Sequence, residues 1–509
     1  MKFNKYFMMG AMGLSLVACS DNLDENGQGM NGNASNEGST YAALKINFES
    51  ASSRVGEVPV DGDNDNGMYN DGQEGNEASV KDVRIVVIDA NGNTEFNQVV
   101  TGVTDGTAKG DDGNLYIFQI TPGEKTFYAV INGNSLGLST ELGSWNGGEL
   151  TLVKKASELC GYNATATEGK GFLMSSVEAV KTTIQDDIDE ATVKAGTANN
   201  VVITVDRVVA KVTMQVKSDI DMDDQTATLK NLTCQIGNAD NLKYDKDAAE
   251  DAKYIGAGTY LMAKDESGYR TTPYYEYALD VSTMTNFNQS QLLSGTATPI
   301  YTDGIPSQTA ARFYCLENTH AANNYLQSNT TFVRVAAEMI PNSALTLSYA
   351  DDNVTVSNKE TMPTDPETFY VVTDAPDQSY NGSYVFESDL AAIYDNVVTD
   401  GQEQEQDAKA KAVVEALAAK GYAFTDPYED GMGYYNIWVN DLKKANGTYE
   451  NIAPVFRNDW YDLTIQSIKL PGDPNPDIDP DQPIHPDTNV GVLLKIRQWN
   501  KVSHNVDLQ

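Results

Sequence analysis

The sequence predicts a mainly β protein with two antiparallel β-sandwich domains. Its 509 residues include 27 tyrosines and 40 glycines, a composition typical of strands joined by many turns. Short alternating segments recur from Val80 onward and are separated by turn sequences such as residues 90–93, Ala-Asn-Gly-Asn. The clearest helical pattern is the alanine-rich stretch 403–420, followed by Gly421. A helix beside so many strands favours a helical insertion in the second sandwich.

The first eighteen residues predict an export signal. Lys2 and Lys5 precede an apolar run over residues 6–18, which at about 1.5 Å per residue is too short to cross a bilayer as a helix. Residues 16–19, Leu-Val-Ala-Cys, resemble a bacterial lipobox, in which Cys19 is lipidated and becomes the new N-terminus. The alternative is a plain secretory signal with an incidental cysteine. Residues 20–40 are rich in Asn, Gly and Ser, which predicts a disordered leash.

Residues 41–50 predict the first strand, with Ala42, Leu44, Ile46 and Phe48 on one face. Arg54 and Val55 follow in a segment rich in Ser, Asp, Asn and Gly, where a trypsin-like protease has easy access. Cleavage between them would release the strand and open a groove one strand wide. The alternative is an ordinary edge strand followed by a loop.

The two predicted sandwiches cover residues 55–208 and 209–470. Strands of the first are expected at 83–89, 115–120, 125–131 and 201–217, and the polar stretch 176–200 favours a short helix. Strands of the second, into which 201–217 continues, are expected at 231–236, 311–316, 331–337, 368–372 and 461–468.

The last twenty residues predict a long strand preceded by a tether. Even positions from Val490 onward form one largely apolar row, which includes Val490, Val492, Leu494, Ile496, Val502, Val506 and Leu508. Residues 471–489 are rich in proline, so this tether is expected to be stiff and extended and to carry the strand away from the body. A detached apolar strand is an aggregation hazard unless a groove accepts it. We therefore predict that residues 490–509 are a donor strand for another copy of the chain.

Composition disfavours several functions. The net charge of −38 argues against nucleic acid as a partner, which would require a basic face. The three histidines are His320, His485 and His504, too few for a histidine-based metal site or a Ser–His–Asp triad in the body. After Cys19, cysteines 160, 234 and 315 remain, and their spacing is not that of a metal site. Whether Cys234 and Cys315 form a disulfide is left open by the sequence. We expect no enzyme activity, no cofactor and no metal.

Several motifs together resemble the fimbrillins, the type V pilins of Bacteroidales, and in particular the stalk subunits of the short fimbria. The motifs are the lipobox, the strand followed by Arg54, residues 204–212, 314–320 and 454–461, the proline-rich tether and the ending 499–508. Residues 20–25, Ser-Asp-Asn-Leu-Asp-Glu, are similar to the acidic tag of Bacteroidales lipoproteins on the outer face of the outer membrane.

The resemblance implies two transthyretin-like domains, a lipid-anchored precursor and a propeptide, residues 19–54. An arginine-specific, trypsin-like protease would cut after Arg54, and the donor strand of one subunit would fill the groove of the next. The implied partners are further copies arranged head-to-tail, accessory fimbrial subunits and, before processing, the outer membrane. Adhesion, aggregation or biofilm formation would follow. Alternatives are a tip or anchor subunit, or a surface glycan-binding lipoprotein.

Overall fold

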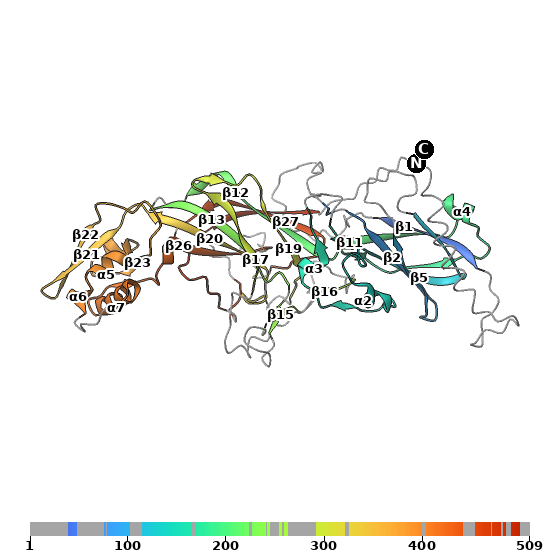
Figure 1. Ribbon diagram of the computed structural model, residues 1–509, viewed down its shortest axis with the longest axis horizontal. Coiled ribbons are helices and arrows are strands. Elements are labelled where there is room, and N and C mark those ends of the chain that lie inside the picture. Colours follow the sequence, from blue (N-terminus) through green and yellow to red (C-terminus); the bar gives the residue numbers. More distant parts are fainter. Residues whose placement is uncertain are drawn as a thin grey trace, which may run out of the picture.

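The computed structural model describes residues 39–47, 76–77, 79–101, 115–163, 169–222, 226–240, 242–244, 254–256, 259–262, 292–320, 325–398, 404–440, 453–469, 471–479, 482–484 and 490–498. Within these residues the protein is mainly β, as predicted, and is elongated (Figure 1). No helix among the described residues is long and apolar enough to cross a membrane.

The N-terminal region folds around one hydrophobic core that draws on almost every strand of an eight-stranded sheet. The sheet order is β3-β2-β5-β9-β11-β1-β4, and β10 also pairs with β5. Its strands are β1 (Thr40–Asn47), β2 (Asp82–Asp89), β3 (Thr94–Thr101), β4 (Leu115–Ile120), β5 (Gly123–Ile131), β9 (Met174–Ser176), β10 (Val180–Ile184) and β11 (Asn200–Arg207). Short elements connect them: α2 (Ser139–Gly143), β6 (Thr151–Leu152), α3 (Ala156–Leu159), β7 (Cys160–Gly161), β8 (Gly171–Phe172) and α4 (Glu190–Lys194).

The central region is a sandwich of two sheets that share a second core. One sheet has the order β19-β12-β27-β28, with β19 (Ala311–Leu316), β12 (Val209–Met222), β27 (Asp459–Ile468) and β28 (Val490–Gln498). The other has the order β18-β17-β13-β20-β26, with β18 (Ile305–Pro306), β17 (Leu293–Thr302), β13 (Ala227–Gly237), β20 (Phe332–Pro341) and β26 (Met432–Trp438). Three short strands lie outside them: β14 (Leu242–Tyr244), β15 (Tyr254–Gly256) and β16 (Thr259–Tyr260).

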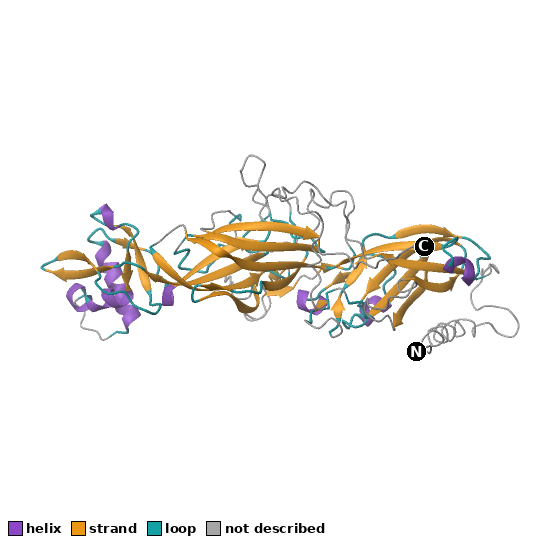
Figure 2. Cartoon of the chain, turned by 90° about the horizontal axis from the view of Figure 1, so that it is seen from above, coloured by secondary structure: helices purple, strands orange, loops and turns teal. Residues whose placement is uncertain are grey.

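The predicted helical insertion is larger than a helix. Between β20 and β26 the chain builds a separate five-stranded sheet with its own core, at the end of the molecule opposite β1 (Figures 1 and 2). Its elements are β21 (Leu345–Ala350), β22 (Asn353–Asn358), β23 (Phe369–Asp374), η4 (Gln378–Tyr380), β24 (Tyr384–Phe386), α5 (Glu387–Ala392), α6 (Tyr394–Val397), α7 (Gln406–Ala418), β25 (Ala423–Phe424) and η5 (Glu429–Gly431).

The predicted helix is α7, and the prediction of its end is confirmed. Gly421 has a φ of +82°, and its amide donates to Ala418 O while the amide of Tyr422 donates to Leu417 O. This pair of bonds is a Schellman motif, which needs a residue in the left-handed conformation. Assigning residues 368–372 to the sandwich was wrong, because β23 pairs with β24 and β25 inside the insertion. Alternation alone does not identify the sheet to which a strand belongs.

Candidate functional site

The first strand, β1, lies inside its sheet. It runs parallel to β11 on one side, where Leu44 pairs with Val201, and antiparallel to β4 on the other, where Leu44 pairs with Tyr116. The alternative of an ordinary edge strand is therefore wrong, because an edge strand has one neighbour. Leaving out β1 from this arrangement separates β11 from β4 by the width of one strand. We call the place that β1 occupies the slot.

The predicted apolar row of β1 is buried, although Ala43 on the opposite face is fully buried as well. Ala42 and Leu44 are fully buried and Ile46 is 1% exposed, whereas Lys45 is exposed. These side chains belong to the N-terminal core together with three stacked or tilted aromatic rings. The ring centroid of Phe118 lies 4.7 Å from that of Phe96 and 6.5 Å from that of Phe127.

Polar contacts hold the beginning of β1. Thr40 Oγ1 accepts from the amide of Ile188 at 2.9 Å, and the amide of Tyr41 donates to Ile188 O at 3.0 Å. Asn199 Nδ2 donates to Tyr41 O at 2.9 Å. Since Ile188 and Asn199 flank α4, the loops around this helix fix the N-terminal end of the slot.

A buried ionic cluster lies where the N-terminal and central regions meet, which we call the waist. Glu77 is fully buried, and its carboxylate oxygens lie 3.0 and 3.1 Å from Lys211 Nζ. Tyr314 donates its hydroxyl proton to Glu77 Oε1 at 2.6 Å. Burial lowers the pKa of Lys211, and the Glu77 carboxylate opposes that shift. Lys211 Nζ also lies 4.7 Å from the Trp460 ring centroid, within cation–π range.

A second set of polar contacts at the waist joins segments distant in sequence. Arg207 donates from Nε to Glu77 O at 3.1 Å and from Nη1 to Asn458 Oδ1 at 3.3 Å. Asn458 Nδ2 in turn donates to Asp206 Oδ1 at 2.9 Å. Burial lowers the pKa of Arg207 to about 10, against the attraction of Glu77 and Asp206. Sequence reasoning noted residues 204–212 and 454–461 only as motifs, and missed Glu77 entirely.

The C-terminal strand β28 pairs with β27 of its own chain. It is antiparallel and forms the edge of its sheet, so it has one neighbour where β1 has two. Four of the even positions that the sequence singles out lie in β28, and each is paired with a buried residue of β27. Val490 pairs with Ile468, Val492 with Ile465, Leu494 with Leu463 and Ile496 with Tyr461.

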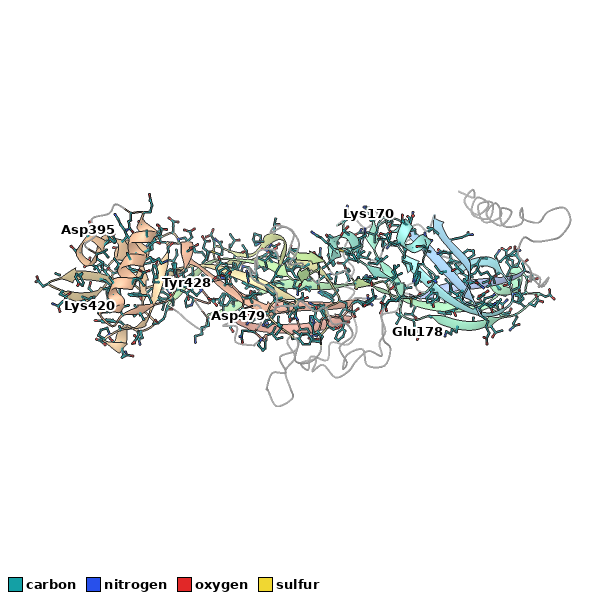
Figure 3. The ribbon with its side chains drawn as sticks, turned by 90° about the horizontal axis from the view of Figure 1, so that it is seen from below. Lys170, Glu178, Asp395, Lys420, Tyr428 and Asp479 are labelled. Carbon is teal, nitrogen blue, oxygen red and sulfur yellow. The ribbon has the colours of Figure 1, made fainter. Side chains whose placement is uncertain are left out.

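The tether does not hold the strand away from the body, so that expectation was wrong. Residues 471–479 and 482–484, which we call the strap, dock on the central region, where Tyr434 of β26 and Asp473 exchange backbone hydrogen bonds of 2.8 and 3.1 Å. Ile478 and Ile484 are 6% and 1% exposed and share a small core with Tyr325, Phe332 and Trp438. Figure 3 shows Asp479 on the central region, between the insertion with Asp395 and Lys420 and the N-terminal region with Lys170 and Glu178. Apolar residues among the prolines provide the anchoring that a proline-rich spacer lacks.

Comparison with known proteins finds sequence matches to fimbrial subunits. Residues 426–505 match the family model for the C-terminal part of fimbrillin, the major fimbrial subunit protein type IV. This span includes β26, β27, the strap and β28. The chain is 23% identical to the minor fimbrium subunit Mfa1 of Porphyromonas gingivalis, over 94% of this chain and 90% of that protein. The resemblance to the fimbrillins is confirmed.

Two solved fimbrial proteins are also similar to this chain. A fimbrilin (FimA) from Porphyromonas gingivalis W83 is 16% identical, with 91% of this chain and 99% of that chain covered and a TM-score of 0.41. The tip fimbrial protein Mfa3 of Porphyromonas gingivalis, truncated at its C-terminus, is 13% identical, with 90% and 100% covered and a TM-score of 0.35. The sequence matches, which point to fimbrial subunits, carry the resemblance.

Several predicted site residues lie outside the described residues. They are Cys19, Phe48, Arg54, Val55 and, in the tail after β28, Val502, Val506 and Leu508. Cys160, Cys234 and Cys315 are all free and buried, so the Cys234–Cys315 disulfide that the sequence left open is not formed. Burial raises the pKa of each of these thiols. Among the described residues there is no group of three or more His, Cys, Asp or Glu side chains that could hold a metal ion.

Proposed function

We propose that this protein is a stalk subunit of a surface fimbria, polymerised by strand exchange. In this proposal it is exported as a lipoprotein through Cys19 and held at the outer membrane. An arginine-specific protease then cuts between Arg54 and Val55 and releases β1. The C-terminal tail of another copy fills the slot, and the fibres mediate adhesion or aggregation.

The observation that carries the proposal is the place of β1 in its sheet. A strand with two neighbours leaves two rows of unpaired backbone groups and an apolar trough when it departs. Residues 48–75, which contain Arg54, begin directly after β1 and precede Asn76 and Glu77, so one cut there separates β1 from the rest of the body. Strand addition to such a slot supplies both hydrogen bonds and side-chain burial.

The length of the segment after β28 supports its role as the donor in the proposed exchange. Residues 490–498 are an edge strand, and the eleven residues 499–509 follow the end of β28. These eleven residues exceed the eight residues of β1. Donor and acceptor surfaces differ, so the contact is head-to-tail and produces an open fibre rather than a closed ring.

Assembly after controlled cleavage tests the proposal. The exported chain, residues 19–509, is treated with an arginine-specific protease and run unboiled on a denaturing gel, with N-terminal sequencing to identify the cut. We expect a ladder that requires cleavage after Arg54.

Three variants control this experiment. Arg54→Gln should block both the cut and the ladder, whereas deletion of 499–509 or of 490–509 should allow the cut and abolish the ladder. A wild-type chain cut after Arg54 that stays monomeric contradicts the proposal. A tip or anchor subunit, or a glycan-binding lipoprotein, would then take its place.

A further inference from the structure

The inward-facing positions of the slot hold side chains of different sizes. Its inward positions hold a small residue, Ala42, followed by two large ones, Leu44 and Ile46, all essentially inaccessible to solvent. Ala42 pairs with Phe118 on β4, and Ile46 pairs with Ile203 on β11. A replacement strand must therefore offer two large apolar side chains two residues apart at the end of the slot nearer the waist.

The last eight residues of the chain, Val502–Gln509, have this pattern. We propose that in the fibre they occupy the slot of a second copy in the direction of β1, with Val506 in place of Leu44 and Leu508 in place of Ile46. This register rests on the proposed function and adds to it a direction, a length and the contacting residues. It places Val502 at Thr40 and Gln509 at Asn47.

Other registers fit the slot less well. A shift by one residue would turn Asn505 and Asp507 toward the core, because side chains alternate between the two faces. A shift by two toward the waist would place His504 at the fully buried position of Leu44. A shift by two the other way would place Val506 at the small, fully buried position of Ala42. The proposed register has two misfits at buried positions: the imidazole of His504 replaces the methyl group of Ala42, and the amide of Asn505 replaces the methyl group of Ala43.

Direction is decided by the same residues. With Val506 kept at the position of Leu44, a reversed tail would carry His504 to the position of Ile46, which is 1% exposed, and Leu508 to the small position of Ala42. Both directions bury the imidazole, at the position of Ile46 or of Ala42, and both overpack the small position. The reversed direction also leaves one of the two large positions without an apolar side chain. In the direction of β1, Leu508 instead takes the large position.

The outer face of the sheet offers a direct readout of the register. Lys45 on β1 is exposed and pairs with Val202 on β11, whose side chain is 53% exposed, and with Leu115 on β4. In the proposed register Asp507 takes the position of Lys45, and Asn505 that of Ala43. Neighbouring strands bring Cα atoms within the range that a disulfide bridges.

Cysteine pairs across the donor and acceptor test this arrangement. The full exported chain carries Val202→Cys with Asp507→Cys in one variant and Val202→Cys with Asn505→Cys in another, and each is cleaved, assembled and oxidised. The three native thiols of the described residues are buried. We expect intermolecular disulfides in most junctions of the first variant and at least tenfold fewer in the second, measured by peptide mass spectrometry.

The outcomes separate the register from the proposed function. Fibres that cross-link through Asn505, or through neither pair, overturn the register and leave strand exchange standing. A wild-type chain that forms no fibre after cleavage overturns both. If the Val202→Cys variants fail to assemble while the wild type does, Leu115→Cys with Asp507→Cys reads the same register from β4. Absence of that cross-link in assembled fibres also overturns it.

Discussion

The strands β1 and β28 occupy opposite situations in their sheets. β1 lies between β11 and β4, and its buried side chains are part of the N-terminal core. β28 has one neighbour, β27, and lies at the edge of the four-stranded sheet. An edge strand can separate by breaking one row of backbone hydrogen bonds, whereas removal of an internal strand breaks two. In the proposed exchange, the place of the internal strand β1 would be refilled by residues that follow the edge strand β28.

The largest expected effect comes from deleting one strand or the other. A chain of residues 55–509 lacks Leu44 and Ile46, whose burial contributes roughly 1.5–3 kcal/mol each, together with two rows of hydrogen bonds. We expect its N-terminal region to lose roughly 5 kcal/mol of unfolding free energy, and a chain of residues 19–489 to lose much less from its central region. Chemical denaturation combined with hydrogen exchange of β4, β11 and β27 measures both. Equal losses would contradict the comparison.

The strands β1 and β28 could be predicted from the sequence, because alternation over 41–50 and 490–498 is a local signal. The internal place of β1 could not, because its neighbours are 70–160 residues away and alternation reports one buried face, not the number of partners. Docking of the strap was missed for a similar reason. Proline-rich composition indicates stiffness, whereas the burial of Ile478 and Ile484 depends on a surface formed by Phe332 and Trp438.

Glu77→Gln tests whether the N-terminal region, which holds β1, and the central region, which holds β28, unfold independently. It removes the charge that Lys211 faces at 3.0 Å in a site closed to solvent, and breaking a buried pair in this way costs about 3–5 kcal/mol. Since the waist contacts both regions, amide exchange should rise at the end of β11 and at the start of β27 alike. Glu190→Gln, in the exposed pair with Lys194, should change stability by less than about 0.5 kcal/mol. A response confined to one region would show that the regions unfold separately.

Leu44→Ala sharpens the comparison at a single position of the slot. Leu44 is fully buried in the N-terminal core, so truncation should cost about 2–5 kcal/mol in the uncleaved chain. Lys45→Ala, on the exposed side of the same strand, should cost less than about 0.5 kcal/mol. After cleavage β1 is gone, so neither variant should alter the stability of the assembled fibre. A fibre weakened by Leu44→Ala would mean that β1 remains in place.

Acidification should act on the central region through a buried histidine that the N-terminal region lacks. Burial lowers the pKa of His320 to about 4, and its Nε2 lies 3.2 Å from Asn329 O with the ring against Tyr325. An unfolded chain binds this proton near pH 6.5, so the neutral imidazole contributes stability that is complete above pH 6.5 and is lost as the pH falls toward 4. The loss amounts to at most about 3 kcal/mol.

The three histidines of the sequence are His320, His485 and His504, so residues 39–208 contain none. The unfolding free energies of the N-terminal and central regions should therefore diverge as the pH falls. Hydrogen exchange between pH 7 and pH 4.5 measures both. His320→Gln should remove this part of the pH dependence from the central region, whatever the variant does to stability at pH 7, because the comparison is between slopes. Carboxylates titrate in the wild type and in the His320→Gln variant alike, so their contribution cancels when the two slopes are subtracted. An unchanged slope in the variant would mean that His320 takes up no proton on unfolding, and that another group sets the acid sensitivity of the region that holds β28.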